Sequence, residues 1–244
     1  MTETGSVAST IPFSNVDGPG NRFVVFLQGC NFDCVACHNP QTIPVFQGGH
    51  ERERYRRSVA DLLADIHRAA PFLSGVTVSG GEAMLQPEFV RDLFTAVKAD
   101  PALAHLTCFI DSNGASDSAT WNIVAPVTDG TMIDLKCLDD RIHREMTGQS
   151  NDQVLAAIER LQTVNLLYEV RLLILAGVND ENTLLRRTGE WLAAVDPQMR
   201  VKVIGFRAHG ARPHDPELVE PAPERLHAVA DLLHTIAPFD ICVV

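Results

Sequence analysis

Three cysteines lie close together in the stretch FVVFLQGCNFDCVACHNP, which begins at Phe23. They are Cys30, Cys34 and Cys37, in a C-x3-C-x2-C spacing directly after an apolar run. Thiolates bind soft or borderline metals, so this loop can hold zinc or an iron-sulfur cluster. A structural zinc needs four protein ligands, and the only close candidate, His38, adjoins Cys37 and is badly placed to converge on the same ion. A cubane 4Fe-4S cluster would instead leave one iron without a protein ligand.

The other three cysteines, Cys108, Cys137 and Cys242, lie inside or at the end of hydrophobic stretches. Clustered cysteines in a reducing compartment more often serve a metal or catalysis than a disulfide. We therefore predict a metal-binding loop at Cys30 to Cys37 and assign the dispersed three to the core.

Other polar residues with chemical potential follow apolar runs. Gly80 and Gly81 would let the backbone approach a ligand closely, and Glu82 offers an acceptor for an ammonium group. Asp134 and Lys136 are two apart on a predicted strand, so their side chains point the same way, which is also the arrangement of a simple internal ion pair.

Arg171 lies in the otherwise apolar run VRLLIL and needs a buried anionic partner. A structural ion pair and a cofactor contact both remain open for it.

The segment DGPG, which contains Asp17 and Gly18, has the composition of a turn.

Apolar runs alternate with amphipathic helical patterns along the chain, which predicts a parallel sheet covered by helices. The predicted strands are 23–27, 75–78, 106–110, 131–135, 169–175 and 201–204. Six such units predict an α/β fold of the (β/α)6 TIM type, a partial barrel. In such folds the chemistry lies at the carboxyl ends of the strands, where most of the residues named above fall.

The 244 residues carry 20 Lys and Arg against 31 Asp and Glu, a net charge of -11. This is the wrong sign for neutralising phosphates, so we predict no nucleic-acid partner. The N-terminus lacks signal-peptide features and no apolar run could span a bilayer, so we predict a cytoplasmic protein without a membrane partner. The length fits a single domain 1–244, with an arm and the DGPG loop in 1–21 and the barrel in 22–244.

Several ordered motifs together resemble the radical S-adenosylmethionine enzymes, and within them the activases of glycyl radical enzymes. They are VDGPGNR (16–22), FLQGCNFDC (26–34), CHNP (37–40), SGGE (79–82) and DLKCLDDRIHREMTG (134–148). The last fits a D-L-K-x-x-D-x-x-x-H-x-x-x-T-G pattern. Residues 38–81 contain no cysteine, so the compact type, without a ferredoxin-like insertion and with one cluster, is expected.

The resemblance implies a laterally open barrel of the radical SAM type and a role for each motif. The open iron would be chelated by S-adenosylmethionine, and further residues of the chain would bind this cofactor. These are Gly80, Gly81, Glu82, Lys136, Arg171, Asn179, His38 and His209. A monovalent cation would be bound by Asp111, Met132 and Asp134. Asp17 and Gly18 would hold the peptide that carries the target glycine.

The activity implied is oxidoreductase chemistry under anaerobic conditions. A flavodoxin or ferredoxin would reduce the cluster, S-adenosylmethionine would be cleaved to a 5'-deoxyadenosyl radical, and this radical would take hydrogen from a backbone glycine of a partner glycyl radical enzyme. Two alternatives stay open. One keeps the radical chemistry but acts on a small molecule such as a modified purine or pterin; the other is a zinc-binding interaction module.

Two departures from the family pattern concern the adenosine. The position before the third cysteine, often aromatic in the superfamily, is Ala36 here. A histidine expected after the sixth strand is replaced by the sequence GFRAHG, in which Arg207 is nearer the expected place and His209 is shifted. The sequence therefore does not identify the residue that would pack against the adenine ring.

Overall fold

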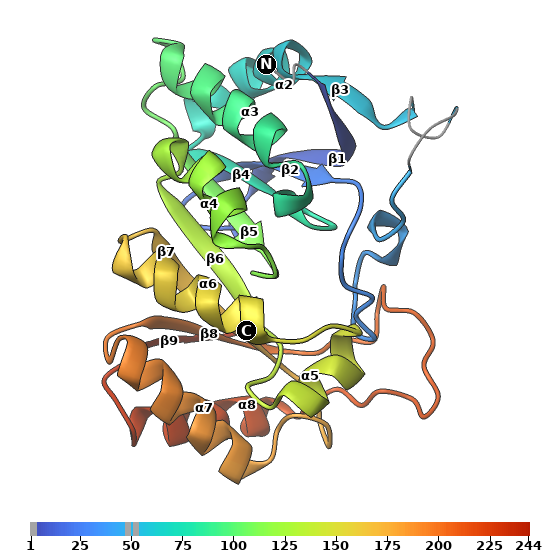
Figure 1. The fold of residues 1–244 in the computed structure, drawn as a ribbon, viewed down its shortest axis with the longest axis vertical. Coiled ribbons are helices and arrows are strands. Elements are labelled where there is room, and N and C mark those ends of the chain that lie inside the picture. The colour runs from blue at the N-terminus through green and yellow to red at the C-terminus, as the bar shows by residue number, and fades with distance from the viewer. Residues whose placement is uncertain (1–3, 47–49, 51–53) are drawn as a thin grey trace. The chain divides into compact units, whose positions relative to one another are not determined.

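The computed structural model describes residues 4–46, 50 and 54–244. Figure 1 shows strands that alternate with helices along most of the chain. The strands are β1 Thr4–Ser14, β2 Arg22–Leu27, β3 Arg56–Ser58, β4 Gly75–Gly80, β5 Thr107–Ser112, β6 Gly130–Leu135, β7 Leu167–Ile174, β8 Arg200–Gly205 and β9 Asp240–Val243. The helices are α2 Val59–Ala69, α3 Pro87–Ala99, α4 Ser118–Val124, α5 Asp140–Thr147, α6 Asp152–Thr163, α7 Asn182–Val195 and α8 Pro223–His234.

The order of strands is β3-β1-β2-β4-β5-β6-β7-β8-β9, which is linear and does not return on itself. The pairs β2–β4, β4–β5, β7–β8 and β8–β9 are parallel, whereas β1 is antiparallel to both β2 and β3. The predicted α/β class with an open, mostly parallel sheet is confirmed, and the six predicted strands correspond to β2 and β4 to β8.

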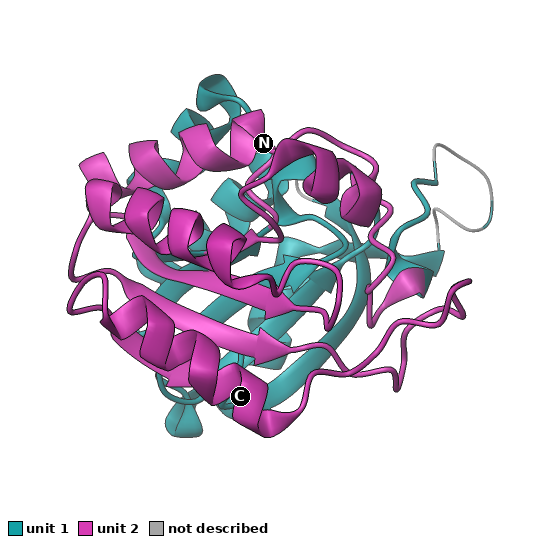
Figure 2. Ribbon diagram, turned by 90° about the horizontal axis from the view of Figure 1, so that it is seen from below, with its two compact units in different colours: residues 1–31, 41–112, 116–132 teal, residues 32–40, 113–115, 133–244 magenta. Residues whose placement is uncertain are grey.

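The chain divides into two compact units, coloured in Figure 2. Unit 1 comprises residues 1–31, 41–112 and 116–132, and unit 2 comprises 32–40, 113–115 and 133–244. Strand β6 and the cysteine loop each begin in unit 1 and continue in unit 2. The prediction of one domain over the whole chain is not tested by this division and stays a prediction.

Unit 1 contains β1 to β5 with α2, α3 and α4. Helix α2 begins at a capping box, in which Ser58 accepts a hydrogen bond from the backbone N–H of Asp61 and the Asp61 side chain accepts from that of Ser58. Pro87 starts α3, where its missing N–H costs nothing. The apolar faces of α2 and α3 are buried, including Leu62, Ile66 and Phe89.

Unit 2 contains β7, β8 and β9 with α5 to α8. Helix α8 packs on β8 and β9 and against α7. The buried residues of β7 and β8 include Val170, Leu172, Val201 and Val203. Strand β9 ends the strand order, and there Cys242 is exposed, so its assignment to the core is wrong. Cys108 and Cys137 are buried, as predicted.

Three strands were not predicted, and each is at or near an edge. Strand β1 replaces the expected N-terminal arm and covers the edge of β2. Only its first half has an alternation of buried residues, and the rest is exposed or half-buried. Strands β3 and β9 have three and four residues, too few to show a period. No helix in the described part of the chain is long and apolar enough to cross a membrane.

Candidate functional site

The cysteine loop begins where β2 ends, and backbone hydrogen bonds fix its first residues in unit 1. Gly29 adopts φ +104°, a conformation that favours glycine. Its N–H donates to the Thr42 carbonyl at 2.8 Å, and the Cys30 N–H donates to the Ile43 carbonyl at 3.0 Å. The buried side chain of Gln28 donates to two further carbonyls of the same segment, those of Gln41 and Pro44. The backbone of Cys30 is therefore held by a chain segment that follows the loop.

The Gly-Gly-Glu turn after β4 holds the same residues from the other side. The Gly81 N–H donates to the Leu27 carbonyl at 2.9 Å and the Glu82 N–H to the Gly29 carbonyl at 2.8 Å. A Cβ on Gly81 would lie 2.1 Å from the Gly29 oxygen, and one on Gly80 would lie 2.1 Å from the Leu27 nitrogen. In the structure the two glycines accommodate the backbone of Leu27 and Gly29, and the close approach of a ligand to them stays a prediction.

Glu82 is buried, with 1% of its surface exposed. Its Oε1 accepts hydrogen bonds from the Met84 N–H at 2.9 Å and from the Ser112 hydroxyl at 2.7 Å. The two hydrogen bonds fix the orientation of the carboxylate. Because it is buried, an adjacent group is favourable only if it is a hydrogen-bond donor or a cation.

Two of the three residues expected at a cation lie in unit 1. Asp111, on β5, accepts a hydrogen bond from the Ser79 hydroxyl at 3.0 Å, and Met132, on β6, is fully buried. In the described residues, no three His, Cys, Asp or Glu side chains are grouped so as to hold a single metal ion. A cubane cluster makes a different demand, because its thiolates bind different irons.

The second and third cysteines lie in unit 2 and share a turn, in which the Cys37 N–H donates to the Cys34 carbonyl at 3.2 Å. Ala36, between them, is buried in a hydrophobic cluster with Met146, Leu175 and Phe206. A bulky aromatic side chain would have to displace these core residues, which explains why a small residue occupies the position.

The thiols are not bonded to one another, and their surroundings suit a ligand role. None of the six cysteines forms a disulfide. Burial raises the pKa of the Cys34 thiol to about 11, Lys136 opposes the shift, and Cys37 and Asp134 reinforce it. A thiol must lose its proton to bind iron, and the metal's charge then offsets what burial and the neighbouring anions disfavour. The donor set therefore fits an iron-sulfur cluster.

Asp134 and Lys136 form the ion pair that their spacing predicts, with Lys136 Nζ 2.7 Å from Asp134 Oδ2. Burial raises the pKa of the Asp134 carboxyl, but Lys136, Arg171 and Lys202 more than offset burial and lower it. Asp134 is thus an anion among three cations.

The partner of Arg171 is Glu169, two residues earlier on β7. Their side chains, both at least nine-tenths buried, meet at 2.9 Å. A structural ion pair is therefore present, and a cofactor contact by Arg171 stays a prediction.

Asn179 is occupied by backbone groups of unit 2. Its Nδ2 donates to the carbonyls of Lys136 at 2.8 Å and Leu173 at 2.7 Å, and its Oδ1 accepts from the Leu175 N–H at 2.8 Å. The side chain closes the turn after β7 and ties it to Lys136. A contact with adenosine is not tested by this arrangement, but Asn179 has a clear structural role.

His38 and His209 differ in environment. The His38 ring stacks on Phe206 at an interplanar angle of 9°, and its Nε2 lies 2.7 Å from the Arg207 carbonyl. His209 is exposed in the segment after β8. Gly210, in the same segment, comes so close to His38 that a Cβ would lie 3.2 Å from the His38 oxygen.

The DGPG turn is fixed by a buried cation to which sequence reasoning gave no role. Arg22, at the start of β2, is fully buried, and its Nε donates to the Thr77 hydroxyl at 2.9 Å. That hydroxyl donates to the Asp17 carbonyl at 2.7 Å, and the Asp17 side chain accepts from the Ser14 hydroxyl. Arg22 thus connects the strand to the turn. The signal that could have found it is an arginine directly before an apolar strand.

The Arg22 guanidinium has further partners in unit 1. It donates to the carbonyls of Val76 at 2.6 Å and Thr107 at 3.0 Å, and stacks 4.5 Å from the centre of the Phe109 ring. A Cβ on Gly75 would lie 2.2 Å from Arg22 Nη1, so this glycine provides the space. A lysine could not replace Arg22, because its single ammonium group lacks the several directed N–H donors of a guanidinium.

We expect Arg22→Met to lower the free energy of unfolding by about 3 kcal/mol, because several buried acceptors lose their donor. Urea denaturation measures it. Arg68→Met, at a side chain that is 72% exposed, is the matched control and should change little. Equal stability of the two variants would contradict the role assigned to Arg22.

We expect Gly81→Ala to fold but to take up roughly half or less of the iron of the unchanged protein, because its Cβ must push the Gly29 carbonyl aside. Iron assay after anaerobic reconstitution measures the loss. Gly177→Ala is the control: Gly177 has φ +74° and no atom within 4 Å of its Cβ position, so it carries backbone strain without that collision. Full iron content in Gly81→Ala would refute the prediction.

Comparison with known proteins agrees with these observations. The model of the radical SAM superfamily matches residues 24–186. The pyruvate formate-lyase-activating enzyme of Streptococcus mutans is 31% identical over 245 residues, which cover 95% of this chain and 92% of the relative. The pyruvate formate-lyase 1-activating enzyme of Escherichia coli K12 is 34% identical over 216 residues, which cover 86% and 84%.

Among solved structures, a radical SAM methyltransferase from Sphaerobacter thermophilus has a TM-score of 0.69. The match covers 98% of this chain and 77% of that chain at 14% identity, a likeness of fold alone. The family match spans more than half of the chain and the relatives align over nearly all of it. The chain therefore belongs to the radical SAM superfamily, in the family of the pyruvate formate-lyase-activating enzymes.

Proposed function

We propose that this enzyme activates a glycyl radical enzyme. When bound, one 4Fe-4S cluster and S-adenosylmethionine supply a 5'-deoxyadenosyl radical, which takes a hydrogen atom from a backbone glycine of the partner. The observation that carries the proposal is the attachment of the cysteine loop to the Gly-Gly-Glu turn through the bond from the Glu82 N–H to the Gly29 carbonyl. This bond joins the chain next to the proposed cluster ligand Cys30 to the proposed cofactor-binding turn, and both lie in unit 1.

The cluster is assigned to Cys30, Cys34 and Cys37, which form no disulfide and lie in a loop whose backbone is fixed by neighbouring elements. Three ligands leave one iron for S-adenosylmethionine. Residues 38–81 add no cysteine, so one cluster is proposed.

The cofactor's charged groups are matched by side chains of the chain. Glu82 is a buried carboxylate whose orientation is set by Met84 and Ser112, and it suits the ammonium group. Lys136 suits the carboxylate. Its backbone is fixed by Asn179 and its charge is now paired with Asp134.

A monovalent cation is proposed near Asp111, the Met132 carbonyl and Asp134. Oxygen ligands with a net negative charge suit a hard cation. A cation there would compete with Lys136 for Asp134 and leave the ammonium group of Lys136 available to the cofactor.

The partner is proposed to be a glycyl radical enzyme, since the relatives are named as activating enzymes of pyruvate formate-lyase. The DGPG turn is proposed to hold the peptide that bears the glycine. Its support is the rigid attachment of Asp17 through Thr77 to Arg22. A flavodoxin or ferredoxin is proposed as electron donor.

Hydrogen transfer from the partner is the decisive step to measure. Pyruvate formate-lyase carrying deuterium on the α-carbon of its glycines is mixed with reconstituted enzyme, S-adenosylmethionine and a reductant. We expect 5'-deoxyadenosine that contains deuterium, together with a glycyl radical in the electron paramagnetic resonance spectrum. The matched controls are unlabelled pyruvate formate-lyase and the variant Cys34→Ala, which lacks a cluster ligand.

Formation of 5'-deoxyadenosine without deuterium, and without a protein radical, would contradict the macromolecular substrate. If a small metabolite then stimulated that formation, the small-molecule alternative would replace it.

A further inference from the structure

Helix α5 carries the residues of the motif DLKCLDDRIHREMTG that the proposed function leaves unused, among them His143 and Thr147. The helix begins after Asp139, whose side chain accepts from the Ile142 N–H at 3.2 Å. It ends at Gly148, which adopts φ +80° and donates its N–H to the Arg144 carbonyl at 2.8 Å. His143 and Thr147 lie on the buried side of the helix, with 0% and 1% of their surface exposed.

The C-terminal turn of α5 binds the middle of the cysteine loop. The last carbonyls of a helix have no partner inside the helix and need outside donors. Here the Thr147 carbonyl accepts from the Asp33 N–H and the Met146 carbonyl accepts from the Val35 N–H, both at 2.9 Å. These donors flank Cys34 on both sides, so the position of α5 decides the position of this ligand.

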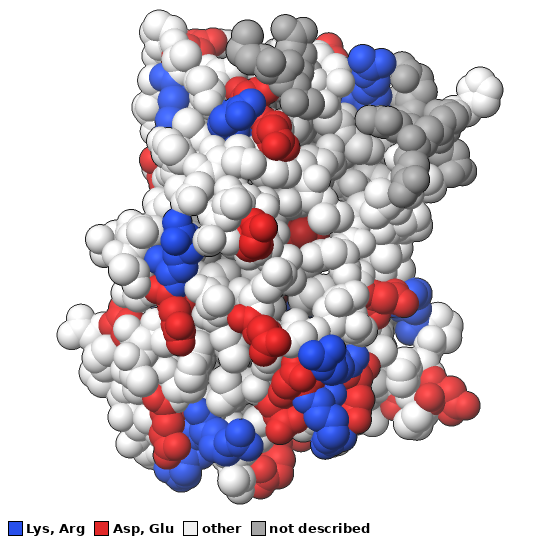
Figure 3. Space-filling view, in the orientation of Figure 1, with Lys and Arg blue, Asp and Glu red and all other residues white. Residues whose placement is uncertain are grey.

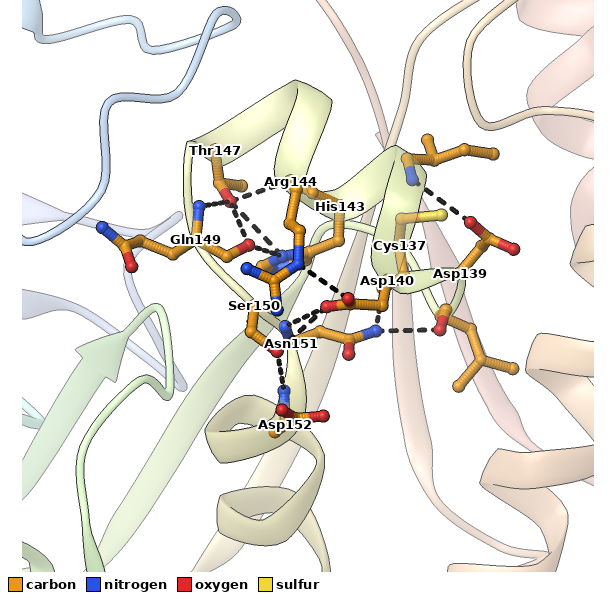
Figure 4. Close-up of polar contacts among 12 residues, drawn as sticks. Cys137, Asp139, Asp140, His143, Arg144, Thr147, Gln149, Ser150, Asn151 and Asp152 are labelled. Carbon is orange, nitrogen blue, oxygen red and sulfur yellow. Dashed lines mark hydrogen bonds and ion pairs between the residues drawn. The ribbon is translucent and has the colours of Figure 1, made fainter.

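A side-chain network closes the end of α5, as Figure 4 shows. His143 Nδ1 lies 3.0 Å from the Gln149 carbonyl, and the Thr147 hydroxyl lies 2.8 Å from the His143 carbonyl. A carbonyl can only accept, so Nδ1 carries the proton. The Nε2 atom is buried and has no hydrogen-bond partner among the described residues. Burial lowers the pKa of His143 and keeps the ring neutral.

The His143 ring also contacts the loop directly. Its centre lies 5.5 Å from that of Phe32, edge to face at 79°. Phe32 is buried and lies between Cys30 and Cys34 in the sequence. The loop is thus attached to α5 by the ring of Phe32 and by the N–H groups of Asp33 and Val35.

The outer face of α5 is different in kind. Arg141 pairs with Glu145 and Arg144 with Asp140, at side chains that are mostly exposed. In Figure 3 basic and acidic side chains mix over the region where Figure 1 places α5. Exposed pairs of this kind contribute little, so the buried face accounts for the fixed position of the helix end.

We propose that α5 clamps the cysteine loop and that His143 is the positioning residue of the clamp, holding Phe32 and the end of the helix so that Cys34 keeps its geometry as a ligand. This inference rests on the proposed cluster at Cys30, Cys34 and Cys37. His143 does not touch the cluster ligands in any described contact. Its effect is on how long a cluster stays bound, not on the chemistry.

The rate at which reconstituted protein loses iron to a chelator under anaerobic conditions tests the clamp. His143→Leu keeps the volume but loses the Gln149 bond, and we expect iron release roughly tenfold faster. His143→Asn places an amide where Nδ1 lies but lacks the ring that contacts Phe32, so we expect a partial rescue, with release roughly threefold faster than in the unchanged protein. The control is Leu161→Ala on α6, a buried site of unit 2 that is not a member of the hydrophobic cluster around Ala36 and whose truncation destabilises the fold.

The outcomes separate the clamp from the proposed function. Release by His143→Leu no faster than by Leu161→Ala, or no rescue by His143→Asn, overturns the clamp alone. An unchanged protein that binds no cluster overturns the proposed function and the clamp with it. Should His143→Leu fail to fold, Gly148→Ala replaces it, since no atom lies within 4 Å of its Cβ position. Gly148→Ala strains only the backbone at the C-terminal end of α5, so we expect iron release roughly threefold faster than in the unchanged protein. An unchanged rate of iron release would overturn the clamp.

Discussion

Backbone hydrogen bonds to fixed elements hold the loop that carries Cys30, Cys34 and Cys37. In unit 1, Gly29 and Cys30 are bound by the segment after the loop and by the Gly-Gly-Glu turn. In unit 2, the residues beside Cys34 are bound by the last carbonyls of α5. Ligands of a cluster must be orientated before iron arrives, because an unformed site makes the metal bear the cost of ordering the chain.

Each of the two units contains buried charged side chains with an identified neighbour. Glu82 is held by Met84 and Ser112, and Arg171 by Glu169. Burying such groups costs free energy that an apolar residue would save. Under the proposed function, a fixed carboxylate would bind a charged group of the cofactor without reorganisation. Arg22 is a further buried charge, and its hydrogen bond to Thr77 fixes the DGPG turn of the proposed peptide site.

Sequence alone predicted β2 and β4 to β8 well, because each is an apolar run followed by a helical pattern. It missed β1, β3 and β9 because edge strands are exposed or short, and for the same reason Cys242 was assigned to the core. Helix α2 begins directly after Ser58 and helix α3 begins at Pro87, and both side chains favour a helix start through local chemistry. Capping depends on neighbouring residues, whereas edge pairing depends on distant ones.

The site residues divide in the same way. The family pattern marked Gly81, Asn179 and His143, but the sequence contains no sign that Gly81 accommodates the Gly29 carbonyl or that Asn179 bonds to Lys136. Those contacts join residues far apart in the chain. The Glu169–Arg171 pair was within reach, because two charged residues at i and i+2 of a strand share a face.

Electron paramagnetic resonance of the anaerobically reconstituted, reduced protein, recorded with and without S-adenosylmethionine, tests whether the three cysteines hold a cluster with one open iron. We expect a 4Fe-4S signal that changes when S-adenosylmethionine is added, since the iron without a cysteine ligand then gains a cofactor. No cluster signal, or a signal indifferent to S-adenosylmethionine, would contradict it.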